Sequence, residues 1–205
     1  NAGAAAARGE WLVFTDDDCL PADGWLAAYE RAFASGHDVY EGRTTCEAGL
    51  TSPRLTAPVN LAGGNLWSCN FAIRRNVFAA LGGFDERFPY PHMEDADFRD
   101  RVVAAGHHIR FVPEATVDHP PRRLPWGTRL ARIHRASVLY MVLHPPKRSL
   151  VWFVRKEIHM RLRSVIGTRK SLDTLSALTS LPVELMAIAT QWRAWHSWAR
   201  RVAGR

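Results

Sequence analysis

Short apolar runs of strand length alternate with segments of helical periodicity as far as Asp118, and this alternation restricts the fold more than any other feature of the sequence. The runs at 10–14, 37–44 and 66–74 are typical of strands, since each is shorter than a buried helix. A helix is predicted to open at Pro21, between the first two runs. Such alternation favours an α/β layer structure with a mainly parallel sheet.

The same reasoning predicts the remaining elements before the alternation ends. Residues 1–10 are interpreted as the end of a helix closed by Gly9, and residues 46–64 as a long connection of the kind that often covers a site. Further along, the patterns predict a short helix ending at 81–83, a loop over 84–92, a helix from 93 to Gly106, and short strands at 109–112 and 115–117.

The overall charge of +7 hides a division at Pro120-Pro121. Residues 1–121 hold 10 Arg and Lys against 17 Asp and Glu, a net charge of −7, whereas residues 122–205 hold 17 against 3, a net charge of +14. An acidic surface suits cation binding, and a basic one suits phosphate-bearing partners such as anionic lipid or nucleic acid. We therefore expect one region over 1–121 and a second, basic helical region over 122–205.

The basic region interleaves Arg and Lys with apolar residues and Trp152 at roughly helical spacing. Asp173, Pro182 and Glu184 interrupt its most apolar stretch, so a membrane-spanning helix is not expected. Basic amphipathic helices with Trp are typical of segments that lie in a membrane interface. The alternative is a helical subdomain that packs on the first region and exposes a solvated basic face.

Cysteine usage favours a reducing compartment. Cys19, Cys46 and Cys69 are odd in number and widely spaced, so neither a disulfide framework nor a zinc site is indicated. We therefore expect a cytoplasmic location.

Three carboxylates, Asp16-Asp17-Asp18, directly follow the first predicted strand. In α/β sheets the ligand site lies beyond the carboxyl ends of the strands. Carboxylate oxygens are ligands that Mg²⁺ and Mn²⁺ prefer, and Mg²⁺ is typically shared with substrate phosphates. The triplet therefore predicts a cation site, and the alternative is that its side chains shape the turn and cap the following helix.

A second acidic cluster, Glu94, Asp95 and Asp97, stands at the start of the helix predicted from residue 93. The helix dipole favours acids in a first turn, so the cluster requires no function. The functional interpretation is a general base, a carboxylate that stays ionised and accepts a proton from an attacking hydroxyl.

Four elements in this order, DDD (16–18), NFAIRR (70–75), GGFDERF (82–88) and ED (94–95), resemble the family 2 glycosyltransferases with the GT-A fold. The resemblance covers residues 1 to about 120. It implies a GT-A-type, Rossmann-like mixed sheet flanked by helices, of which residues 1–121 would be the C-terminal part. The family's first βα units and nucleotide-base pocket would precede Asn1, so the chain resembles an N-terminally truncated member, and we expect this chain alone to be inactive.

The resemblance also implies roles for individual residues. Asp16 and Asp18, with His119 as a third ligand, would hold the Mn²⁺ or Mg²⁺ ion that bridges the diphosphate of a nucleotide-sugar donor. Asp95 would be the catalytic base, supported by Glu94. Donor and acceptor contacts would come from Asp17, Trp67, Asn70, Arg74 and Asp97.

The function implied is an inverting, metal-dependent glycosyltransferase that moves a sugar to a hydroxyl acceptor, a cell-envelope or lipid-linked glycan. We expect peripheral contact with the inner face of a membrane through residues 122–205. One alternative is a metal-dependent nucleotidyl or phosphoryl transferase, in which the two acidic clusters hold two ions. Another is a nucleic-acid-binding module that uses the basic region. It leaves the acidic half unexplained, so nucleic acid is not the expected partner.

Overall fold

The computed structural model describes residues 1–144, 149–166 and 172–204. Its contacts divide the chain into two compact units. The first unit comprises residues 1–48, 57–85 and 94–120, and the second comprises 49–56, 86–93 and 121–205. Two segments from the earlier part of the chain thus belong to the unit that contains the basic region. Lys147 and Arg148, two of its basic residues, lie outside the described residues.

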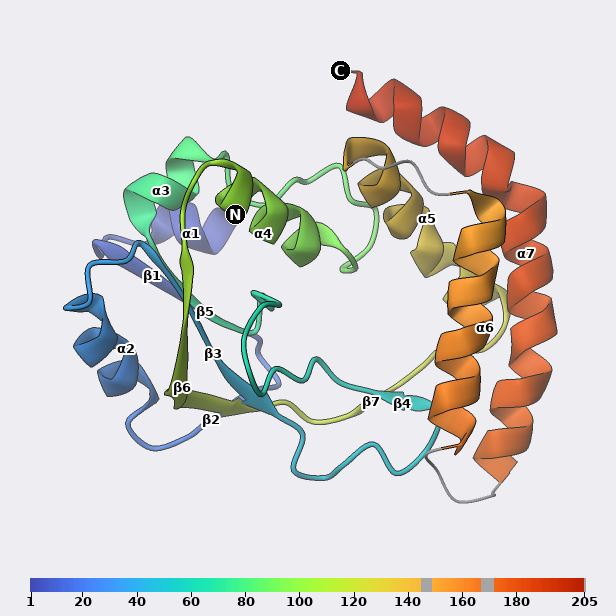
Figure 1. Cartoon of the computed structure of the whole chain (residues 1–205), viewed down its shortest axis with the longest axis horizontal. Coiled ribbons are helices and arrows are strands. Elements are labelled where there is room, and N and C mark those ends of the chain that lie inside the picture. Colours follow the sequence, from blue (N-terminus) through green and yellow to red (C-terminus); the bar gives the residue numbers. More distant parts are fainter. Residues whose placement is uncertain (145–148, 167–171, 205) are drawn as a thin grey trace. The chain divides into compact units, whose positions relative to one another are not determined.

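A five-stranded sheet forms the centre of the first unit, with the strand order β1-β5-β3-β6-β2 (Figure 1). Its strands are β1 (Trp11–Thr15), β2 (Leu20–Pro21), β3 (Val39–Thr45), β5 (Asn70–Arg74) and β6 (Ile109–Asp118). β3 and β6 pair in parallel, whereas the β1–β5, β3–β5 and β2–β6 pairs are antiparallel. The expectation of a mainly parallel sheet was wrong because β5 runs back between β1 and β3. The mixed sheet implied by the family resemblance is confirmed.

Helices cover both faces of this sheet (Figure 1). The helices of the first unit are α1 (Ala2–Ala6), α2 (Trp25–Phe33), α3 (Arg75–Ala80) and α4 (Glu94–Ala104). Because side chains alternate along a strand, Phe71 and Ile73 pack with Phe78 of α3 and Phe98 of α4, whereas Ala72 between them packs with Tyr29 of α2. The helix predicted from Pro21 starts instead at Trp25, since Pro21 pairs with Val117 in the β2–β6 ladder.

A bulge interrupts the β3–β6 pair. Gly42 pairs with Val112 but the next residue, Arg43, pairs with Thr116, so residues 113–115 of β6 have no partner on β3. The two strands predicted at 109–112 and 115–117 are therefore one strand with an irregularity at Pro113, whose missing N–H prevents a regular ladder.

The second unit is mainly helical. It contains α5 (Thr128–Leu143), α6 (Leu150–Ile166) and α7 (Leu172–Ala203), together with a small ladder of β4 (Leu55–Thr56) and β7 (Arg122–Arg123). The three helices share one apolar core, and α6 and α7 run alongside each other in orange and red in Figure 1.

The helix α7 continues through Pro182, so the residues that interrupt the apolar run do not end the helix. By length and composition alone, it is the one helix among the described residues that meets the criteria for crossing a membrane.

Candidate functional site

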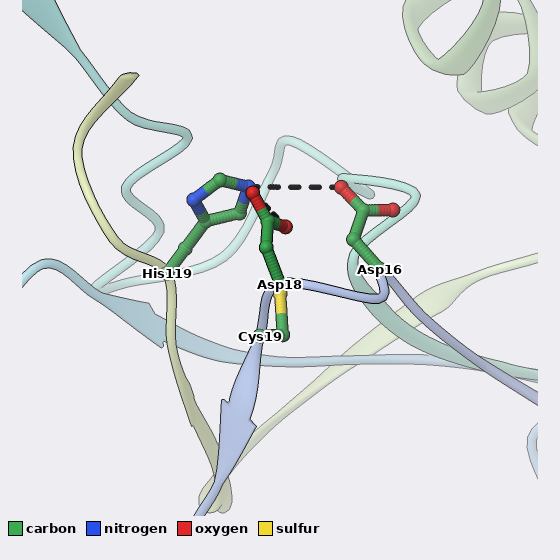
Figure 2. A group of neighbouring side chains, drawn as sticks. All are labelled: Asp16, Asp18, Cys19 and His119. Carbon is green, nitrogen blue, oxygen red and sulfur yellow. Dashed lines mark ion pairs between the residues drawn. The ribbon is translucent and has the colours of Figure 1, made fainter.

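The carboxyl ends of β1 and β6 bring the first acidic cluster and a histidine together. β1 and β3 each run antiparallel to β5, and β3 runs parallel to β6, so all three point toward the same edge of the sheet. The Asp16–Asp18 turn follows β1 directly, and His119 follows β6. Figure 2 shows Asp16, Asp18 and His119 with their polar ends turned toward one another.

His119 is held in a fixed orientation. Its ring is fully buried, and its backbone N–H donates to the Thr45 carbonyl at 2.9 Å. Nδ1 lies 2.8 Å from the Pro120 carbonyl oxygen, which accepts hydrogen bonds but cannot donate them, so Nδ1 carries the proton. Nε2 therefore presents a lone pair in the neutral ring, 3.6 Å from Asp16 Oδ2 and 3.6 Å from Asp18 Oδ1.

This arrangement fits a cation. His119 Nε2 is buried and has no hydrogen-bond partner among the described residues, although it faces two carboxylates. Only the ring is buried, since the side chains of Asp16 and Asp18 are 32% and 35% exposed. A divalent ion would satisfy all three groups at once, and imidazole with carboxylates suits Mn²⁺ better than Mg²⁺.

Cys19 is a fourth member of this cluster that the sequence reasoning missed. One ligand atom each from Asp16, Asp18, Cys19 and His119 lies within 4.8 Å of the others. Burial raises the pKa of the Cys19 thiol, and the carboxylates of Asp16 and Asp18 raise it further, while hydrogen bonds from Asp16 and Thr15 lower it. Motif searches for paired cysteines do not detect it, and its position directly after the Asp triplet was the available signal.

Asp95, in the second acidic cluster, interacts electrostatically with Asp16 of the first. It is the second residue of α4, and burial raises its pKa from the ordinary 3.8 to about 6. A hydrogen bond from the Ala96 N–H, 2.7 Å from Oδ1, lowers the pKa, and the charge of Asp16 raises it. Asp95 is thus close enough to Asp16 for their charges to interact. A pKa nearer neutrality makes a carboxylate a better proton acceptor at pH 7 than an ordinary aspartate is.

The two acids next to Asp95 differ in their surroundings. Glu94 is half-buried at the first position of α4. Asp97 is buried and pairs with Arg101 one turn later at 2.8 Å, and Arg101 also donates to the carbonyls of Leu81 and Gly83. Asp97 therefore ties α4 to the turn after α3, and its role in donor or acceptor binding stays a prediction.

Asn70 was also predicted to contact substrate, and its environment argues against that role. Its amide N–H₂ donates to the carbonyls of Arg43 and Ala115 at 2.8 and 2.9 Å. Its Oδ1 accepts from Trp25 Nε1 and the Tyr29 hydroxyl at 2.9 and 2.8 Å. These four bonds use the whole hydrogen-bonding capacity of a buried amide. Asn70 connects α2 to β3 and β6.

Arg74 lies at the end of β5 that is remote from the Asp triplet, because of the direction in which β5 runs. β5 is antiparallel to β1, so Asn70 pairs with Thr15 beside the Asp triplet while Arg74 pairs with Trp11 at the opposite end. There the guanidinium forms ion pairs with Glu10 and Asp38 and lies over the Trp11 ring. These contacts argue against the predicted substrate contact of Arg74, which stays a prediction.

Asp17 and Trp67 complete the predicted set. The Asp17 side chain is exposed and is not among the four clustered residues. Trp67 is half-buried, and its Nε1 lies 3.4 Å from the Val59 carbonyl within the 57–69 connection.

Glu41 organises that connection, and the sequence reasoning missed it. Its buried carboxylate accepts hydrogen bonds from the Asn60 side chain and from the backbone N–H groups of Gly64, Asn65 and Leu66. A Cβ on Gly63 would lie 2.9 Å from Glu41 Oε1, so glycine is required for this close approach. The available signal was an acidic residue directly after Val39 and Tyr40, the apolar start of β3.

A separate groove on the first unit, with a volume of about 700 Å³, lies between residues 62–64, the second half of α4 and the start of β6. None of the predicted site residues lines it.

Comparisons with known proteins give the chain glycosyltransferase relatives. It is 33% identical over 110 residues to the N-acetylglucosaminyl-diphospho-decaprenol L-rhamnosyltransferase of Mycobacterium tuberculosis, which covers 52% of this chain and 34% of that protein. It is 33% identical over 125 residues to the succinoglycan biosynthesis protein ExoM of Rhizobium meliloti, covering 55% and 40%. The chain therefore spans a third to two fifths of the length of these relatives. No family model matches it.

The fold is similar to that of a solved GT-A glycosyltransferase. The structure of GalNAc-T7 with UDP, GalNAc and Mn²⁺ aligns with 94% of this chain and 43% of that chain, at a TM-score of 0.51 and 17% identity. At this identity the likeness concerns the fold alone, and it agrees with the mixed sheet and flanking helices described above.

Proposed function

This chain has the GT-A fold and is related in sequence to glycosyltransferases, and from that premise we propose that the protein transfers a sugar from a nucleotide-diphosphate donor to a hydroxyl acceptor with inversion at the anomeric carbon. The observation that carries the proposal is the buried Nε2 of His119, which faces Asp16 and Asp18 without a hydrogen-bond partner among the described residues. Residues 1–121 would supply the catalytic part.

Asp16, Asp18 and His119 would hold the divalent cation, Mn²⁺ or Mg²⁺. When bound, the cation neutralises charge on the leaving diphosphate. The hydrogen bond between Nδ1 and the Pro120 carbonyl keeps the His119 lone pair on Nε2, and the sheet edge holds the two carboxylates around it. Asp118 supports this edge, since its Oδ1 accepts from the Thr45 hydroxyl and the Glu47 N–H at 3.0 and 2.7 Å.

Asp95 would act as the base. Its carboxylate takes the proton of the acceptor hydroxyl while that oxygen attacks the anomeric carbon from the side opposite the diphosphate. Its raised pKa suits this step, because a base with a pKa near 6 is mostly ionised at pH 7 yet holds a proton better than an ordinary aspartate. Glu94, beside it at the start of α4, would support its position. Asp17 and Trp67 would contact the donor or acceptor.

The acceptor would be a cell-envelope or lipid-linked glycan, in keeping with the decaprenol-linked substrate in the name of the mycobacterial relative. Such an acceptor places the reaction at a membrane, and residues 122–205, with a net charge of +14, would provide peripheral contact with its inner face.

Cation binding tests the proposal without requiring donor or acceptor. Titration of Mn²⁺ followed by electron paramagnetic resonance reports free ion directly. We expect saturable binding that Asp18→Ala and His119→Ala each weaken by about tenfold or more, consistent with the loss of a ligand. Asp17→Ala is the matched control, since it removes the exposed neighbour of the same charge. Equal loss in all three variants, or no binding by the parent, would contradict the assigned ligands.

The base role is tested by Asp95→Asn in the complete protein, since this chain alone is expected to be inactive. We expect sugar transfer to a lipid-linked acceptor to fall by a factor on the order of 100 or more, while the calorimetric affinity for nucleoside diphosphate with Mn²⁺ is unchanged. Undiminished transfer in this variant would remove Asp95 from the mechanism.

A further inference from the structure

Polar and charged side chains are buried in the interior of the second unit. Glu184 of α7 is 1% exposed and accepts hydrogen bonds from His134 Nε2 of α5 at 3.0 Å and from Arg161 Nη2 of α6 at 2.8 Å. Each of the three helices contributes one of these buried polar groups. A buried ion pair of this kind costs desolvation energy, which its mutual hydrogen bonds offset.

The outward face of α7 shows the opposite character. Its exposed apolar residues recur every three or four positions along one side of the helix, at Leu172, Leu175, Leu178, Pro182, Met186 and Ala189. Leu172, Leu175 and Met186 are 86%, 60% and 70% exposed. The two acids in this stretch lie off the outward stripe, Glu184 in the core and Asp173 in contact with Ser52. We call these six residues the apolar stripe.

The stripe is too long to be a scattering of surface leucines. Residues 172–189 of an α-helix extend about 27 Å at 1.5 Å per residue. The stripe carries no charge and lies on α7, the helix that is long and apolar enough to cross a membrane. Only 22% of the apolar segment of that helix is buried within the protein. Contiguous exposed apolar surface of this extent marks a contact with lipid or with another protein.

Positive charges on the neighbouring helix favour lipid over another protein as the contact of the stripe. On α6, the exposed apolar residues Val151, Leu162 and Ile166 alternate with exposed Arg155, Lys156 and Arg163. This mixture of apolar and basic side chains is typical of helices that lie in the headgroup region of anionic bilayers. A second copy of the chain would carry the same excess positive charge, and like charges oppose that association.

We propose that α6 and α7 form a membrane-docking face, in which the apolar stripe enters the boundary between headgroups and acyl chains and Arg155, Lys156 and Arg163 bind anionic headgroups. The inference deepens the membrane part of the proposed function. The opposite side of α7 stays packed on α5 and α6, so the helix lies along the bilayer surface and does not cross it.

Vesicle flotation tests the proposal without nucleotide, so its failure is separable from failure of the Mn²⁺ titration. The protein is mixed with neutral phosphatidylcholine vesicles or with vesicles that also contain phosphatidylglycerol. We expect flotation with the anionic vesicles, and a loss of affinity of more than about tenfold in Leu175→Asp/Met186→Asp. Leu26→Asp is the matched control, because Leu26 lies on α2 of the first unit and is 58% exposed.

Insertion is measured separately with a polarity-sensitive fluorophore on Leu175→Cys and, for comparison, on Leu26→Cys. We expect a blue shift on addition of anionic vesicles from position 175 alone. This readout keeps the proposal testable if the double variant fails to fold. Flotation that Arg155→Glu/Lys156→Glu abolishes but Leu175→Asp/Met186→Asp leaves intact would mean electrostatic adsorption and overturn the insertion. Dimerisation that the stripe variant abolishes, without vesicle binding by the parent, would assign the stripe to a second copy and also overturn the proposal.

Discussion

The Nε2 atom of His119 lies 3.6 Å from Asp16 Oδ2, yet it forms no hydrogen bond among the described residues. The histidine is fully buried. Its proton is committed to Nδ1 by the Pro120 carbonyl. A divalent ion bound here would contact both groups, and the first prediction below concerns which metal the cluster would take.

Cys19 should influence which metal binds. Thiolate prefers softer ions than carboxylate does, so a cluster that includes Cys19 is expected to bind Cd²⁺ and Zn²⁺ and to release Mn²⁺ when they are added. Cys19→Ser should weaken Cd²⁺ binding by about tenfold or more and change Mn²⁺ affinity little. Competition titrations measure both, with Cys46→Ser as the control for a general loss of thiol. Unchanged Cd²⁺ affinity in Cys19→Ser would exclude the thiol as a ligand.

Asp95 should make stability depend on pH in a definite direction. Its pKa is about 6 when folded and 3.8 ordinarily, so above pH 6 the folded protein holds a buried carboxylate that is better solvated when unfolded. Asp95→Asn removes this cost and should raise the free energy of unfolding at pH 8 by about 1 to 2 kcal/mol. The gain should shrink as the pH falls from 6 toward 4, where the folded state takes up a proton first, and should vanish below the unfolded pKa of 3.8, where both states of the wild type are protonated. Urea unfolding at several pH values checks this, and a gain that grows on acidification would contradict the assignment.

The Asn70 amide should matter for stability more than for cation binding. Asn70→Ala leaves four buried partners without their hydrogen bonds, including Trp25 Nε1 and the Tyr29 hydroxyl, and should cost about 2 to 4 kcal/mol. Asn76→Ala, on the exposed side of α3, is the control and should cost less than about 1 kcal/mol. Chemical unfolding followed by circular dichroism measures the difference. Similar losses in both variants would mean that the Asn70 network contributes little.

Glu41→Gln should loosen residues 60–66. An amide oxygen accepts fewer hydrogen bonds than the carboxylate, and its N–H₂ would face the backbone donors of the connection. We expect faster amide hydrogen exchange at Asn65 and Leu66, by about tenfold or more, with Glu114→Gln on the exposed side of β6 as the control. Unaltered exchange in Glu41→Gln would show that Gly63 and Gly64 fix the loop by themselves.

The buried ion pair of the second unit should be costly to break and inexpensive to replace. Glu184→Ala leaves Arg161 buried without its partner and should cost about 3 to 5 kcal/mol. The double variant Arg161→Met/Glu184→Leu removes both charges and should recover most of that loss. Thermal unfolding of the three proteins tests this, and a double variant no more stable than Glu184→Ala would indicate that packing, not charge, sets the cost.

The sequence predicted the strands and helices of the first unit well where hydrophobic periodicity decides the structure. β1 and β3 are each displaced by one or two residues from the expected ranges, and α3 ends where Gly82 indicated. Strand direction was predicted wrongly, because apolar runs carry no information about whether β5 runs parallel or antiparallel to its neighbours. The family resemblance supplied the mixed sheet that periodicity could not.

The candidate site was likewise predicted only in part. Asp16, Asp18 and His119 were predicted and lie together, because they follow strands that share an edge. Asn70 and Arg74 were assigned to substrate from the family resemblance, but a resemblance in sequence does not reveal whether a polar side chain already has its hydrogen-bond partners within the protein. Glu41 was missed because its hydrogen-bond partners are distant in sequence, and Cys19 was missed because only paired cysteines were considered as ligands.

The bulge in β6 determines which face of the strand each later side chain occupies, and so the direction in which His119 points. Side chains of a strand alternate between its faces, and the three unpartnered residues 113–115, an odd number, invert that alternation for every residue that follows. In the present phase Asp118 faces Thr45 and the next residue, His119, faces Asp16. A deletion or insertion of one residue at Pro113 would exchange these two side chains and turn the imidazole away from the carboxylates, although no residue of the site had been altered.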